Sequence, residues 1–138
     1  MAEGEGPRRP RGRRRLSQSR RDFELLVREA VAGLPPGIRR RLANVAVVVE
    51  EEPTAEDQAA AGLPEAEPLF GLYQGTPLTA RSSYYGMVLP DKITIYRGPI
   101  TRFCRSRREM RAEVRQTILH EFAHHFGISD DELDELGI

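Results

Sequence analysis

The stretch that decides the fold runs from Ser106 to Gly127 and reads SRREMRAEVRQTILHEFAHHFG. Ser106 with Glu109 three residues later predicts a capping box at a helix start, and Gly127 suits the left-handed conformation that ends a helix. Apolar residues recur at a spacing of four, which places them in one stripe of an α-helix: Met110, Val114, Ile118, Phe122 and Phe126. We therefore predict a long amphipathic helix whose stripe packs on a sheet.

The run His120-Glu121-Phe122-Ala123-His124 lies inside this helix. Histidines four residues apart project side by side from adjacent turns, and zinc prefers imidazole nitrogens as ligands. Glu121 lies about 100° around the helix from His120, beside such a metal, where it can accept a proton from water activated by the ion. The spacing predicts zinc ligands at His120 and His124 and a general base at Glu121. The alternative is two histidines that only pack on or cap a helix.

The third metal ligand is less directly indicated. Catalytic zinc sites usually have three protein ligands and an open position for water. Asp130 follows Gly127 by three residues, so that the motif reads HExxHxxGxxD. Asp130 and Asp131 also follow a Ser129 cap, where they would favour the positive end of a last helix without any metal, and Asp131 is the alternative ligand. His125 points away from the His120 and His124 face, which favours a supporting or surface role.

The rest of the chain predicts an α+β fold. A helix of about three turns is expected over residues 23–34, a mobile loop over 51–68 rich in Pro, Glu and Ala, and a short terminal helix that begins at the Ser129 and Glu132 cap. Strands are expected at 44–50, 69–73 and 92–97, with a further strand at 84–89 that pairs with the last of these through a Pro90-Asp91 turn.

Composition separates a tail from one domain. The 138 residues have no net charge, yet residues 1–21 hold eight Arg against two Glu, a balance of +6. Apart from Met1, residues 1–20 contain Leu16 as their only large apolar side chain, so we predict a disordered Arg-rich tail at 1–20 and a single domain at 21–138. No apolar run approaches the roughly 18 residues of a membrane helix, and no signal peptide is apparent, so a cytoplasmic protein without membrane contact is expected. The single cysteine, Cys104, is expected to be an inert thiol.

The run His-Glu-Phe-Ala-His-His-Phe-Gly-Ile-Ser-Asp over 120–130, followed by Leu136-Gly137, resembles the zincin-like metallopeptidases with a minimal zincin domain, a small bacterial family. The resemblance extends upstream through GLYQGTPL at 71–78 and LPDKITIY at 89–96, so it covers roughly residues 22–138. It implies a small mixed sheet packed on an N-terminal helix and a long active-site helix. It also implies Zn²⁺ held by His120, His124 and Asp130, with Glu121 as the general base.

Three functions follow from these observations. The first is a zinc metallopeptidase that acts on a peptide or protein substrate. The second is a metal-dependent endoribonuclease, a class that has a similar His-x-x-x-His-x-x-Gly spacing but normally lacks the Glu, so Glu121 favours the peptidase. The third is a non-catalytic binding module in which the metal only braces the helix. The Arg-rich tail suits a weak, unspecific contact with polyanions, although such runs are usually solvated. The sequence does not determine the oligomeric state.

Overall fold

The structure is a computed structural model that describes residues 19–64, 66–75 and 90–135. Most of the predicted tail and the predicted strand at 84–89 lie outside these residues. Ser19 and Arg20, which the sequence analysis placed in the tail, begin the first described helix, α2 (Arg20–Ala32). The Ser19 hydroxyl caps it by accepting a 2.8 Å hydrogen bond from the Asp22 amide. The predicted N-terminal helix is therefore confirmed, and a short helix α3 (Pro36–Arg41) follows with Pro36 in its first turn.

The sheet has three strands and is mixed, which confirms the predicted α+β class. β1 (Val45–Glu50) and β3 (Asp91–Tyr96) are parallel neighbours, and β2 (Gly71–Gln74) pairs with β3 antiparallel. The order β1-β3-β2 makes β2 an edge strand. Three of the four predicted strands thus correspond to observed strands within one or two residues at each end.

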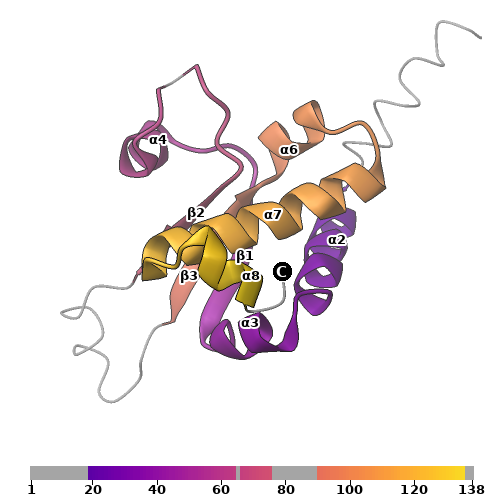
Figure 1. Cartoon of the computed structure of the whole chain (residues 1–138). Helices are drawn as coiled ribbons and strands as arrows, with labels where there is room; N and C mark the ends of the chain where they lie inside the picture. Colours follow the sequence, from indigo (N-terminus) through magenta and orange to yellow (C-terminus); the bar gives the residue numbers. More distant parts are fainter. Residues whose placement is uncertain (1–18, 65, 76–89, 136–138) are drawn as a thin grey trace, which may run out of the picture.

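The main core lies between one face of the sheet and the two longest helices (Figure 1). α7 (Arg107–Phe126) crosses this face beside α2, and both helices bury apolar side chains against Ile93 and Ile95 of β3. The predicted stripe of α7 is buried from Met110 to Phe122, but the side chain of Phe126 is 49% exposed. This part of the prediction was wrong, because the last turn of α7 extends beyond the core that buries the other members of the stripe.

The region predicted as a mobile loop contains helix α4 (Ala55–Ala61), so that prediction was wrong. Thr54 and Asp57 form a reciprocal capping box, which together with the alanines stabilises a short helix. The residues around the end of α4 cover the other face of the sheet, where Ala61 and Leu63 pack against a second apolar cluster: Leu69, Leu72 and Tyr96. The sheet is therefore covered on both faces.

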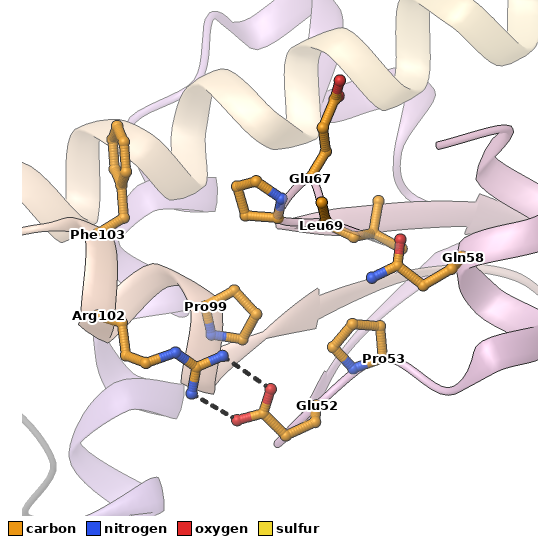
Figure 2. Close-up of a pocket in the computed structure, with 10 residues that line it drawn as sticks. Glu52, Pro53, Gln58, Glu67, Leu69, Pro99, Arg102 and Phe103 are labelled. Atoms are coloured by element: carbon orange, nitrogen blue, oxygen red, sulfur yellow. Dashed lines mark hydrogen bonds and ion pairs between the residues drawn. The ribbon is translucent and has the colours of Figure 1, made fainter. Parts of the chain in front are cut away.

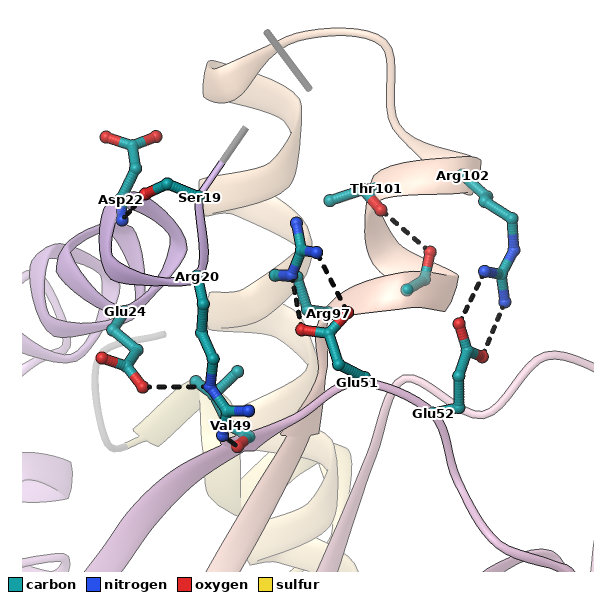
Figure 3. A network of polar contacts seen from close by, with 11 residues as sticks. Ser19, Arg20, Asp22, Glu24, Val49, Glu51, Glu52, Arg97, Thr101 and Arg102 are labelled. Carbon is teal, nitrogen blue, oxygen red and sulfur yellow. Dashed lines mark hydrogen bonds and ion pairs between the residues drawn. The ribbon is translucent and has the colours of Figure 1, made fainter. Parts of the chain in front are cut away.

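Three arginines hold the chain at and after the end of β1 (Figure 3). Two come from opposite ends of α6 (Arg97–Phe103), a helix that the sequence analysis did not predict, and one from the start of α2. Arg97 binds the Glu51 carboxylate through two hydrogen bonds of 2.7 and 3.0 Å, and Arg102 binds the Glu52 carboxylate through two of 2.7 and 2.9 Å. Each guanidinium lowers the pKa of the carboxyl it binds. The third arginine, Arg20, donates a hydrogen bond to the Val49 carbonyl near the end of β1.

Both ends of α7 follow the predicted capping pattern with one difference. The Ser106 hydroxyl accepts from the Glu109 amide at 3.1 Å, but the Glu109 carboxylate binds the amide of Arg105, one residue before the cap. Gly127 ends the helix in the left-handed region, at φ 66°. The short helix α8 (Asp130–Glu135) follows, capped by Ser129 and Glu132 as predicted. In the described part of the chain no helix is long and apolar enough to cross a membrane.

Candidate active site

The two candidate zinc ligands lie one turn apart near the C-terminal end of α7. The side chains of His120 and His124 are both exposed, whereas Glu121 between them is half-buried. This arrangement follows from the helix geometry, since residues four apart share a face and the next residue is turned toward the neighbouring strand. Two accessible imidazoles therefore stand beside a carboxylate that reaches into the protein.

Glu121 is held by the edge strand. Its Oε1 atom accepts a 3.0 Å hydrogen bond from the backbone N–H of Tyr73 in β2. Burial raises the pKa of the Glu121 carboxyl above its ordinary value, and the Tyr73 amide and the charges of His124 and His120 oppose that rise. The contact fixes one carboxylate oxygen and leaves Oε2 as the second acceptor.

β2 and α7 run side by side in the same direction. Residues two apart along β2 and just after it lie beside helix residues four apart. The Tyr73 amide binds Glu121, and a Cβ atom added at Gly71 or at Gly75, the residue after β2, would lie 2.5 Å from Thr117 or 3.7 Å from His125. The two spacings agree because two residues of a strand span about 6.6 Å and four residues of a helix span about 6 Å. Each of these three residues therefore lies beside a successive turn of α7.

The outer edge of β2 faces the candidate site. Phe70 accepts a hydrogen bond from Tyr96 at 2.9 Å, so its backbone faces β3. Backbone groups alternate along a strand, which turns those of Gly71 and Tyr73 away from β3. The bond from Tyr73 to Glu121 agrees with this alternation. A backbone edge and the carboxylate thus lie next to each other.

Tyr73 also organises the C-terminal turn of α7. Its ring stacks on His125 with centroids 3.9 Å apart and planes at 20°, and Phe126 meets it edge-on at 5.8 Å. Its hydroxyl donates a 2.8 Å hydrogen bond to Asp91. The imidazole of His125 therefore contacts the strand, a position that agrees with a supporting role.

A pocket of about 240 Å³ opens beside His120 and Glu121, toward the N-terminal end of α7. Gln116 lines it, and its side-chain nitrogen lies 2.8 Å from Nε2 of His120, so a metal at Nε2 would replace Gln116 as the partner of this atom. The remaining lining residues come from α7 and from the segment that leads into β2: Glu113, Thr117, Leu63, Pro68, Leu69, Phe70 and Gly71.

A sequence family described as zincin-like metallopeptidase matches residues 42–138. The chain belongs to the zincin-like metallopeptidase family. The match begins at Leu42, after α3, and so is shorter than the 22–138 expected from the resemblance. It includes the whole sheet and the HExxH helix, although α2, which packs against that helix, lies outside it. No curated protein matches the chain.

Zincin-like proteins typically bind zinc, and the donors present here are of the type that zinc prefers. His120 and His124 supply two exposed imidazoles. Among the described residues no group of three His, Cys, Asp or Glu side chains could hold a metal. Asp130 is the first residue of α8, but its side chain lies outside the description, and Asp131 is exposed. The third ligand stays a prediction.

A second hollow of about 440 Å³ lies beyond Pro68 and Leu69, which line both it and the pocket beside His120 (Figure 2). The ion pair of Glu52 with Arg102 closes one side, and Pro99 and Phe103 stand beside it. None of its lining residues is a His or Cys. The described residues of this hollow therefore lack the imidazole and thiolate ligands that zinc prefers.

Sequence reasoning missed the residues that support the motif. Tyr73 and Gly71 were part of the resembling segment GLYQGTPL, but no role was assigned to them. A glycine and an aromatic residue alternating on one face of a short strand were the available signal. Glu113, Gln116 and Thr117 are spaced along the helix at three and four residues, which places them on the same side as His120.

Proposed function

We propose that this protein is a zinc-dependent peptidase. Its metal would be held by His120, His124 and Asp130, and Glu121 would serve as the general base. The contact of Glu121 with Tyr73 carries the proposal, since it places the carboxylate between the histidine pair and a strand edge.

The chain's own groups divide the work of hydrolysis. Zinc, when bound, supplies a Lewis acid that polarises a carbonyl and makes water more acidic. Glu121 accepts a proton from the attacking water at Oε2, because Oε1 is already bound by the Tyr73 amide. The same oxygen then donates that proton to the amine that leaves when the peptide bond breaks. The backbone bond keeps the carboxylate in one orientation through both transfers.

The outer edge of β2 would bind the substrate backbone. An extended peptide that lies antiparallel to β2 forms hydrogen bonds with the backbone groups of Gly71 that point away from β3, whereas the Tyr73 amide stays bound to Glu121. In this orientation the residues after the scissile bond lie toward Gly71. The residues before it lie toward Gln74 and the last turn of α7.

The test is a comparison of wild-type protein with Glu121→Gln. Zinc content is measured by elemental analysis, and cleavage is measured by mass spectrometry on a mixture of short peptides. Glutamine keeps an oxygen for the Tyr73 bond but cannot take a proton at neutral pH, so we expect full zinc content and a rate lower by roughly 10²- to 10⁴-fold. Glu56→Gln, at an exposed position of α4, is the matched control.

Two outcomes contradict the proposal. Loss of zinc in Glu121→Gln would make Glu121 a ligand and the site structural, in favour of the binding module. Equal rates in Glu121→Gln and wild type would assign the hydrolysis to another base or to a contaminant.

A further inference from the structure

The pocket beside His120 lies where the residue after the scissile bond would be placed. It is lined by His120 and Glu121 at one end and by Gly71 at the start of β2. A peptide antiparallel to β2 runs from Gln74 toward Gly71, so its side chain just past the site enters this pocket. This reasoning rests on the proposed function, because it uses that peptide orientation.

The walls of the pocket combine two kinds of surface. The segment that leads into β2 contributes apolar side chains, among them Leu63, Leu69 and Phe70. α7 contributes polar ones, among them Glu113 and Thr117. Among the described residues no Lys or Arg lines the pocket, and the carboxylates that do, those of Glu113 and Glu121, are negative. An occupant with an apolar stem and a positive end matches both surfaces.

Glu113 differs from the other glutamates near α7. Glu29 binds Arg107 and Arg111, and the carboxylate of Glu109 caps the helix start. In the described part of the chain the hydrogen-bond partner of Glu113 is the Thr117 hydroxyl, which donates to Oε2 at 3.2 Å, and no ion pair is formed. α7 is rich in arginine, yet the carboxylate that faces the pocket has no cationic partner.

We propose that this pocket selects a lysine or arginine side chain immediately after the scissile bond, with Glu113 as the residue that determines the preference. The aliphatic stem packs on Leu69 and Phe70, and the cationic end pairs with the Glu113 carboxylate. Because the pair is partly exposed, the preference over an uncharged side chain of similar length is roughly three- to tenfold. An acidic side chain is disfavoured.

The experiment measures binding, so it does not depend on turnover. The probes are short peptides capped with a zinc-binding hydroxamate placed either before or after a variable residue, which is Lys, norleucine or Glu. Calorimetry on the zinc-loaded protein gives each dissociation constant. With the hydroxamate before the variable residue, we expect Lys to bind three- to tenfold more tightly than norleucine, and Glu most weakly.

Variants assign the preference to one carboxylate. The Glu113→Gln variant should bind the Lys and norleucine probes with equal dissociation constants, and the Glu113→Lys variant should bind the Glu probe most tightly. Glu56→Gln, which removes the same charge from an exposed position of α4, should keep the wild-type ratio. Because the dissociation constants of two probes are compared within one variant, a change in the stability of that variant affects both equally and does not alter their ratio.

The outcomes separate this inference from the proposed function. If the protein takes up no zinc, both fail together. If zinc and the probes bind but Lys and norleucine bind equally, or if Glu113→Gln keeps the ratio, only the pocket assignment is overturned. A Lys preference seen only when the hydroxamate follows the variable residue would also overturn it, since the pocket would then hold the preceding side chain.

Discussion

The backbone amide of Tyr73 donates to the side chain of Glu121 across 48 positions of sequence, at a distance of 3.0 Å. This bond joins the edge strand β2 to α7 at the residue proposed to move protons. The spacing between the two elements therefore controls the orientation of the Glu121 carboxylate.

Gly71 sets that spacing. A Cβ atom at this position would lie 2.5 Å from Cγ2 of Thr117 and 3.0 Å from the carbonyl oxygen of Thr94. We expect Gly71→Ala to push β2 away from α7, to lower the free energy of unfolding by about 1–3 kcal/mol as overpacking usually does, and to weaken hydrolysis. Urea denaturation and peptide-cleavage rates measure the two effects.

The matched control is Gly33→Ala, whose added Cβ would meet nothing closer than 3.5 Å. The double variant Gly71→Ala with Thr117→Ser removes the closest atom and should recover part of the lost stability. Equal stability of Gly71→Ala and wild type would show that the contact between Gly71 and α7 does not set the spacing.

Zinc binding should depend on two of the three histidines. His120→Ala and His124→Ala should lose the metal, because their side chains are accessible on the same face of α7. His125→Ala should keep most of it, since His125 stacks on Tyr73. Elemental analysis after dialysis measures the content, and circular dichroism checks that each variant is folded. Equal loss in all three variants would contradict the assignment.

The third ligand can be identified by comparing adjacent aspartates. Asp130→Ala should weaken zinc binding by at least the roughly tenfold effect of a supporting group, whereas Asp131→Ala should have little effect. Competition with a chromophoric chelator gives both affinities. If the two changes have the same effect, electrostatics at the start of α8 explains them better than coordination.

Cys104 should be a slow nucleophile despite being the only cysteine in the chain. It is buried at the end of α6, and burial raises the pKa of its thiol to about 11. Because the thiolate is the reactive form and the raised pKa keeps the thiol protonated at pH 8, iodoacetamide should react much more slowly with native than with urea-unfolded protein. Similar rates in both states would show that Cys104 is accessible.

Sequence patterns predicted the elements whose signals are local. The caps and the stripe of α7 lie within one helix, so its start at Arg107 and its end at Gly127 could be read directly. The strands were recognisable as short blocks rich in β-branched or aromatic residues. The HExxH pair was predictable for the same reason, since helix geometry alone places His120 beside His124.

The parts that were missed depend on neighbours distant in sequence or on competing signals. α4 was taken for part of a loop because the segment 51–68 around it is rich in Pro, Glu and Ala, although Thr54 and Asp57 cap the helix. α6 begins directly after β3, so the strand signal concealed its start. The contacts of Tyr73 with Glu121 and of Gly71 with Thr117 arise only when strand and helix pack together. No local pattern indicates them.

The pair of Arg107 with Glu29, 3.0 Å long, joins residues 78 positions apart and reflects how the domain must assemble. Contacts between such distant segments require the closure of a long loop, which slows folding. During synthesis the part of the apolar face of α2 that packs on α7 is not covered until α7 has left the ribosome. The helix that bears the metal motif is thus also the element that completes the core. Any local unfolding that releases α7 therefore breaks the contact of Glu121 with Tyr73 and exposes apolar core side chains in one event.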